Sequence, residues 1–149
     1  MSFAEDYKAA TEQFVNLVST LSESDLDRSD SEGWTPRQVI HHMADSEAQS
    51  YARLRRLIAE PGTTIQGYDE GLWAENPTLG YKELDIEDSL EIIKAVRKSS
   101  YVLLTRLNEN QLNSSGIHTE TGNYTVHDWL KSYVNHPIDH ANQIKKQIS

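Results

Sequence analysis

The clearest helix signal in the sequence is the stretch WTPRQVIHHMADSEAQSYARLRRLIA, residues 34–59. Thr35 has the position of an N-cap, Pro36 follows at the first helical position, and Gln38 lies three residues after the cap, as in a capping box. The pattern stops where Pro and Gly follow at 61–62. The sequence therefore predicts a long helix with a defined start and end.

Three further stretches carry apolar residues three and four positions apart, the spacing of an amphipathic helix. Together with the first stretch they predict helices over Phe3–Leu21, Thr35–Ala59, Ile86–Leu107 and Thr125–Ile148. The last begins with a capping Thr125 and an acid three residues on, and Asp85 is expected to cap the third. No comparable run alternates with a period of two, so strands are expected only as a short pairing within a loop.

The connections between these helices are uneven in length. Residues 61–85 form a connection of about 25 residues, longer than the ~12–15 residues of an ordinary structureless loop, which favours a lid or a crossover. Four amphipathic helices with one long middle connection predict an all-α four-helix bundle in which the second and third helices run parallel. At this length we expect a single domain over residues 1–149.

Composition narrows the possible functions. The chain carries 14 Lys and Arg against 23 Asp and Glu, a formal charge of −9, which argues against nucleic-acid binding. It has no cysteine, which excludes a disulfide, a thiolate metal site and a cysteine nucleophile. Residues 1–10 lack the apolar run of a signal peptide, and no stretch approaches the ~20 apolar residues of a membrane span. We therefore expect a cytoplasmic protein that does not bind membranes.

Two histidines, His136 and His140, lie four residues apart near the end of the last predicted helix. This spacing places both imidazoles on one helix face, within the apolar stripe, where they can share one metal ion. The alternative is two partly buried polar residues at a helix end. Pro137 between them removes a backbone hydrogen bond to the Tyr133 carbonyl and is expected to kink the helix.

A third ligand has to come from another helix. His42 falls on the edge of the apolar face of the second predicted helix, whereas His41 falls nearly opposite that face and is expected to be solvated. Three neutral imidazoles with an open position are typical of a catalytic metal site. Imidazole ligands suit Zn²⁺, Ni²⁺, Fe²⁺ or Cu²⁺.

Three segments, taken in order, resemble the DinB/YfiT-like superfamily. Residues 34–45 resemble its second-helix signature, in which a ligand His follows the Trp by eight residues and an Asp comes three later; this register selects His42. Residues 136–144 resemble its last-helix pair of histidines followed by Gln-Ile. Residues 68–74 resemble the Tyr-Asp-Glu-x-x-Trp segment of its long loop, so the likeness extends over essentially the whole chain.

The resemblance implies an up-down-down-up four-helix bundle and frequent homodimers. It also implies one divalent metal, most often Zn²⁺ or Ni²⁺, held by His42, His136 and His140. Related proteins include transferases and isomerases that use bacillithiol, mycothiol or glutathione. The implied activity is therefore S-transfer from a low-molecular-weight thiol cosubstrate to a small electrophile, or a related thiol-dependent reaction.

Other residues are candidates for supporting roles. Tyr68, Asp69 and Trp73 are expected to cover the pocket, the alternative being a loop anchored by one buried Trp. Arg53 lies on the same helix edge as the ligand histidine and could meet an anionic substrate, the alternative being a surface salt bridge. Asp45 could accept a hydrogen bond from a ligand imidazole.

The remaining candidates are Glu47, His118 and His127. Glu47 is a second possible acceptor for a ligand imidazole, the alternative being a solvated acid. His118 could reach the mouth of the site or be a solvated loop histidine, and His127 is expected to be structural or exposed.

Two other functions remain open at this point. One is hydrolysis by metal-bound hydroxide, with Asp45 or Glu120 as the proton acceptor. The other is a non-catalytic binding module that holds no metal.

Overall fold

Four long helices dominate the fold of this computed structural model, which describes residues 2–29 and 33–149. Short helices and three strands occupy the connections. The elements are α1 (Phe3–Ser19), α2 (Glu23–Leu26), α3 (Pro36–Ala59), β1 (Thr64–Ile65), α4 (Glu70–Glu75), α5 (Glu87–Leu104), α6 (Glu109–Leu112), β2 (Ser115–His118), β3 (Gly122–Thr125) and α7 (Val126–Ile148).

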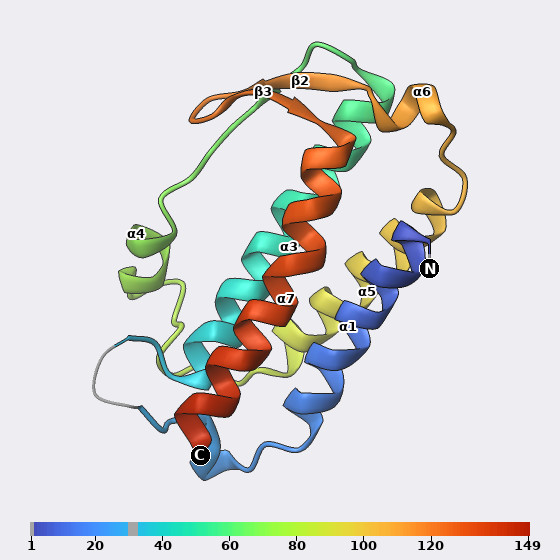
Figure 1. Cartoon of the computed structure of the whole chain (residues 1–149). Coiled ribbons are helices and arrows are strands. Elements are labelled where there is room, and N and C mark those ends of the chain that lie inside the picture. The colour runs from blue at the N-terminus through green and yellow to red at the C-terminus, as the bar shows by residue number, and fades with distance from the viewer. Residues whose placement is uncertain (1, 30–32) are drawn as a thin grey trace.

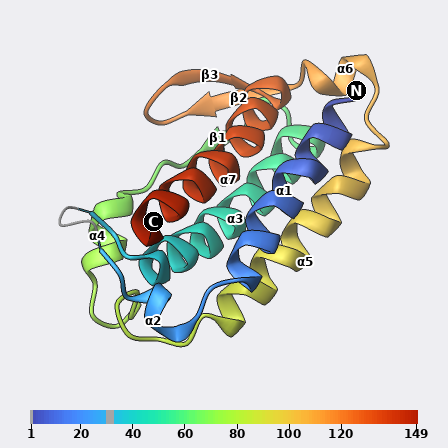
Figure 2. The same ribbon diagram turned by 60° about the horizontal axis from the view of Figure 1, so that its bottom comes forward.

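The long helices form a four-helix bundle with the predicted direction pattern. Helices α3 and α5 run in one direction and α1 and α7 in the other (Figure 1). Helix α3 packs against α5 and α7, and α1 packs against the same two helices (Figure 2). Given these directions, the parallel neighbours are α3 with α5 and α1 with α7. The all-α, up-down-down-up prediction is confirmed.

The helix starts follow the local sequence. Thr35 and Gln38 make both hydrogen bonds of a capping box at the start of α3, and Thr125 and Asp128 do the same for α7. Asp85 does not cap α5, because the helix begins one residue later than predicted; its carboxylate accepts a hydrogen bond from the Glu87 amide at 2.8 Å instead.

The long connection between α3 and α5 is a crossover with structure of its own. Strand β1 pairs in parallel with β2, and β2 pairs with β3 in an antiparallel hairpin, so the sheet has one strand more than the predicted loop pairing. Gly116 permits the close approach of β1, because a Cβ there would lie 2.5 Å from the Thr63 carbonyl oxygen. The rest of the crossover, including α4, lies along the lower half of α3 (Figure 1).

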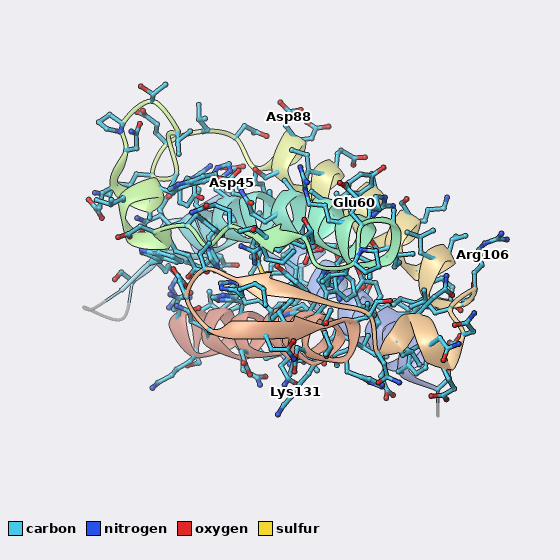
Figure 3. The ribbon with its side chains drawn as sticks, turned by 90° about the horizontal axis from the view of Figure 1, so that it is seen from above. Asp45, Glu60, Asp88, Arg106 and Lys131 are labelled. Carbon is cyan, nitrogen blue, oxygen red and sulfur yellow. The ribbon has the colours of Figure 1, made fainter. Side chains whose placement is uncertain are left out.

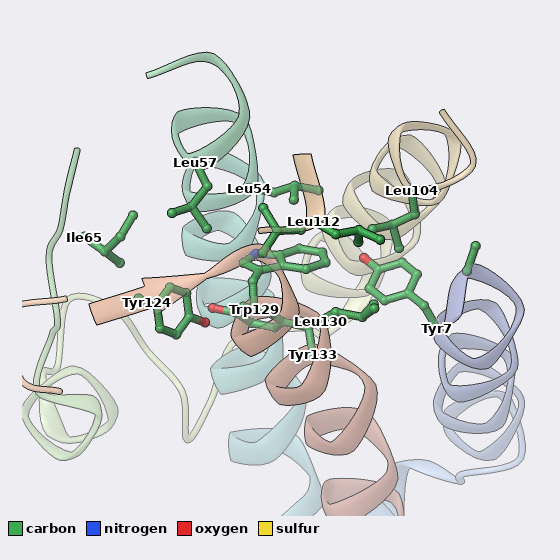
Figure 4. Packing of buried hydrophobic residues seen from close by; sticks show 12 residues of the cluster. Tyr7, Leu54, Leu57, Ile65, Leu104, Leu112, Tyr124, Trp129, Leu130 and Tyr133 are labelled. Carbon is green, nitrogen blue, oxygen red and sulfur yellow. The ribbon is translucent and has the colours of Figure 1, made fainter. Parts of the chain in front are cut away.

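Two apolar clusters stabilise the bundle. The cluster near the hairpin is centred on Trp129, which lies between Leu54 of α3 and Tyr7 of α1 (Figure 4) and donates its indole N–H to the Ser50 carbonyl at 3.0 Å. The second cluster contains Met43 and Ile144 and lies toward the other end.

Charged side chains such as Asp88, Arg106 and Lys131 project from the outside of the bundle (Figure 3). Within the described ranges, no helix combines the length and the apolar character needed to cross a bilayer.

Candidate metal centre

Three histidine side chains from two helices converge inside the bundle. The Nε2 atom of His136 lies 3.1 Å from Nε2 of His42 and 3.0 Å from Nε2 of His140. A potential ligand atom from each of the three residues lies within 4.8 Å of the other two. The structure therefore brings together the three residues that the sequence singled out.

The antiparallel packing of α3 against α7 produces this arrangement. His136 and His140 are one helical turn apart on α7 and face α3, where His42 is 1% exposed. The Trp34 ring lies over His42, with ring centroids 4.8 Å apart, and closes one side of the cluster.

Hydrogen bonds determine how the rings present their nitrogens. Nδ1 of His140 lies 2.7 Å from Oε1 of Gln143, an atom that only accepts, so Nδ1 carries the proton and Nε2 keeps its lone pair. The Nδ1 atoms of His42 and His136 are buried and have no hydrogen-bond partner among the described residues.

This donor set fits a divalent transition metal. The central Nε2, that of His136, carries either one hydrogen or one lone pair, so it cannot form good hydrogen bonds to both neighbours at 3.0 and 3.1 Å. One cation can accept all three lone pairs at once. Three imidazole ligands leave a coordination position open, as catalytic sites require.

Burial keeps the three rings neutral, which is the form that binds metal. Burial and the neighbouring His140 lower the pKa of His42 from 6.5 to about 4. Burial, His140, His42 and Arg97 lower the pKa of His136 to about 2. Burial also lowers the pKa of His140.

His41 is not solvated, contrary to the prediction made from its position on the helical wheel of the second predicted helix. It is 5% exposed, with Nδ1 2.7 Å from Ser89 Oγ and Nε2 2.9 Å from the Leu84 carbonyl oxygen. Helix α5 and the segment before it cover this face of α3, so the side that was expected to face water is an interhelical contact.

The two carboxylates considered as partners of a ligand imidazole have other partners. Asp45 accepts a hydrogen bond from the Tyr81 hydroxyl at 2.5 Å. Glu47 is not solvated: it is fully buried and forms an ion pair with Arg97 at 2.8 Å. Among the described residues, neither carboxylate makes a hydrogen bond to the three histidines.

A cavity of about 270 Å³ lies directly beside His136. Two of the predicted substrate-binding residues, Arg53 and Tyr68, line it. Its remaining lining comes from α3, α4, the hairpin and α7: Ser46, Glu70, His118, Glu120, Thr121, Tyr124, Ser132 and Tyr133.

The other two predicted substrate residues do not line this cavity. Asp69 caps α4 by accepting a hydrogen bond from the Leu72 amide at 2.9 Å, and Trp73 packs on Tyr68 with ring centroids 4.6 Å apart. His118 is buried and belongs to the cavity wall, whereas His127 is exposed.

Sequence reasoning missed Glu70 and Tyr133 as cavity residues. Glu70 directly follows Tyr68 and Asp69 in the loop segment 68–74, so its place in that segment could have identified it as a cavity residue. Burial and the neighbouring Glu120 raise the pKa of Glu70. Tyr133 falls on the apolar stripe of the last helix and was treated as part of the core.

Comparisons with known proteins find relatives that match most of this chain. A protein of Oceanobacillus iheyensis named "putative metal-dependent hydrolase" is 38% identical over 130 residues, which cover 87% of this chain and 74% of the relative. A second protein of that organism with the same description is 29% identical over 140 residues, covering 93% of this chain and 79% of the relative.

Two solved structures share the architecture. YfiT from Bacillus subtilis, described as "a probable metal-dependent hydrolase with an unusual four-helix bundle topology", superposes with a TM-score of 0.83 at 28% identity, covering 97% of this chain and 84% of that one. An uncharacterised protein of Clostridium difficile 630 gives a TM-score of 0.67 at 18% identity, covering 97% and 92%, and shares the fold alone. The family model that matches residues 6–144 is that of the DinB superfamily, and the chain belongs to this superfamily.

Proposed function

We propose that this protein is a divalent-metal-dependent enzyme that transfers a low-molecular-weight thiol to a small electrophile. The observation that supports the metal is the convergence of three neutral imidazoles, from His42, His136 and His140, beside a cavity. Zn²⁺ and Ni²⁺ are the metals proposed, since both accept imidazole ligands. When bound, such a metal lowers the pKa of a coordinated thiol or water, so that a nucleophile forms at neutral pH.

The residues of the chain then bind and orient the two substrates. The chain has no cysteine, so a thiol nucleophile has to enter as a cosubstrate. Arg53 lines the cavity, with its guanidinium anchored on the Gln66 carbonyl at 2.7 Å and on the Tyr133 hydroxyl at 3.3 Å. An arginine held in this way can bind a carboxylate of the thiol or of the electrophile.

Burial of the histidines supports this role. Because their pKa values lie below the ordinary range, their Nε2 lone pairs are available at neutral pH without prior deprotonation. Gln143 fixes the ring of His140, the kind of support that metal-ligating histidines usually receive.

Hydrolysis by a metal-bound hydroxide is the second candidate. Two observations favour it: the relatives named as metal-dependent hydrolases, and the carboxylates of Glu70 and Glu120 in the cavity wall. The raised pKa of Glu70 makes its carboxylate a stronger proton acceptor than an ordinary glutamate, which suits a general base.

Cobalt substitution tests the proposal. The untagged protein, stripped and refilled, should bind about one Co²⁺ per chain, and His42→Ala should abolish this binding while helical content stays near native. Titration with bacillithiol, mycothiol or glutathione should then produce a sulfur-to-metal charge-transfer band for at least one thiol, with release of a proton.

The alternative outcomes are informative. If Co²⁺ binds but no thiol perturbs its spectrum, the transferase proposal fails; hydrolysis of an ester or amide that is lost in Glu70→Gln then supports the second candidate. If no metal binds, the chain is a non-catalytic binding module.

A further inference from the structure

Pro137 interrupts the backbone hydrogen bonds of α7 between the two histidines of that helix. Proline has no amide hydrogen, so the carbonyl of Tyr133, four residues earlier, lacks its usual helical partner. The Tyr133 side chain is buried, and a buried carbonyl without a hydrogen-bond partner is costly.

Arg97 of α5 donates the missing hydrogen bond. Its Nη2 atom lies 2.8 Å from the Tyr133 carbonyl oxygen, and its side chain is fully buried. The same guanidinium donates from Nη1 to Oε1 of Glu47 at 2.8 Å, from Nε to Oγ1 of Thr11 at 2.6 Å, and from Nη2 to the Tyr7 carbonyl at 3.5 Å. One side chain therefore links all four long helices.

We infer that Arg97 is a positioning residue for the three-histidine site, because it bonds the carbonyl that Pro137 leaves free and so holds α7 where His136 and His140 face His42. This inference rests on the proposed function for its link to metal binding. The hydrogen bonds of Arg97 and the positions of the histidine rings do not depend on a metal.

The location of the bonded groups supports this role. The Tyr133 carbonyl lies in the turn of α7 that leads into His136, so a rotation of this turn moves the imidazole. Glu47 lies five residues after His42 on α3, so Arg97 connects the two helices that carry the histidines. Loss of supporting interactions around metal ligands typically weakens metal binding by about 10–100-fold.

A simpler role for Arg97 is to neutralise Glu47 and stabilise the fold. The two roles differ in their dependence on residue 137. Pro137→Ala restores a backbone N–H that can donate to the Tyr133 carbonyl, and this makes the bond from Arg97 redundant. It leaves the pairing with Glu47 unchanged.

The test is a double-mutant cycle of Arg97→Lys and Pro137→Ala. Lysine keeps the positive charge for Glu47, but a single ammonium nitrogen cannot occupy both Nη positions. With Pro137 present, Arg97→Lys should raise the Kd for Co²⁺ by about tenfold or more; with Ala at position 137, the increase should be about threefold or less. An equal increase in both backgrounds would overturn the inference.

A second readout does not depend on metal. In the chelator-treated protein, Arg97→Lys should shift the imidazole ¹⁵N resonances of His136 and His140 and leave that of His127 unchanged. When Pro137→Ala is also present, Arg97→Lys should no longer shift the resonances of His136 and His140. Unchanged resonances of His136 and His140 would refute the positioning role, whether or not the protein binds metal. A failure to bind metal would by itself refute only the proposed function.

Ile93→Val provides the matched control. Ile93 is fully buried on α5, one turn before Arg97, and belongs to the apolar cluster of Met43. The variant should reduce stability while leaving the Kd for Co²⁺ and the histidine resonances unchanged. A comparable rise in Kd in this control would mean that metal affinity follows general stability, against the inference.

Discussion

Lowering the pH should destabilise the metal-free protein through its buried histidines. His42 is 1% exposed, and its pKa is about 4 in the folded protein against 6.5 ordinarily. Between these two values the unfolded chain binds a proton at His42 that the folded protein does not bind. The free energy of unfolding therefore falls as the pH falls from 6.5 toward 4.

The size of this effect follows from the two pKa values. At about 1.4 kcal/mol for each pH unit between them, His42 alone accounts for about 3 kcal/mol. His136 and His140 act in the same direction, because burial lowers both of their pKa values. A loss of this size is a large part of the ~5–15 kcal/mol that stabilises a typical domain.

The assay is urea unfolding followed by circular dichroism on chelator-treated protein at about pH 7.5 and about pH 4.5. The comparison is with His42→Leu, which removes the titrating ring but retains an apolar side chain. Carboxylates such as Glu47 titrate in both proteins, so their contribution cancels. The wild type should lose about 2.5 kcal/mol more than the variant on acidification, because a pH of about 4.5 lies slightly above the pKa of His42 in the folded protein. Equal losses would show that His42 is not kept neutral by burial.

Three further predictions concern single residues. His41→Ala should lower the free energy of unfolding by about 2–3 kcal/mol without removing bound Co²⁺, because the buried His41 ring is hydrogen-bonded to Ser89 and to the Leu84 carbonyl; loss of the metal would assign the ligand role to His41. Trp73→Ala should weaken thiol binding, measured by titration of the cobalt protein, more than it reduces metal content, because Trp73 supports Tyr68 at the cavity. Equal loss of folding and binding would make Trp73 a core anchor. Arg97→Met should cost about 3–5 kcal/mol in urea unfolding, because it leaves Glu47 buried and unpaired; a neutral effect would mean that Glu47 is protonated in the folded protein.

Local rules account for the parts of the structure that the sequence could predict. Thr35 and Thr125 begin their helices as predicted because a capping box needs only residues within one turn. The apolar period identified the four long helices for the same reason. The long crossover favoured a parallel arrangement of α3 and α5, since a short loop joins only antiparallel neighbours.

The candidate ligands were also identifiable from the sequence. His136 and His140 share a face because the helical period places residues i and i+4 together. The choice of His42 over His41 agreed with the wheel, but the expectation that His41 is solvated was wrong. A wheel shows where a side chain points relative to its own helix, and it does not show that α5 covers the second face of α3.

Contacts between distant segments were decided only by the tertiary structure. Arg97 is the hydrogen-bond partner of both Glu47 and the Tyr133 carbonyl. In the sequence, Arg97 is one of many charged residues on its helix, and nothing in that pattern marks it as buried. The cavity beside His136 likewise combines α3, α4, the hairpin and α7. The sequence by itself determines these helices and the faces that carry the histidines, because caps and periodicity act within a few residues. Which faces meet depends on how all the helices pack at once, and only that packing brings a buried guanidinium to the carbonyl that Pro137 leaves free.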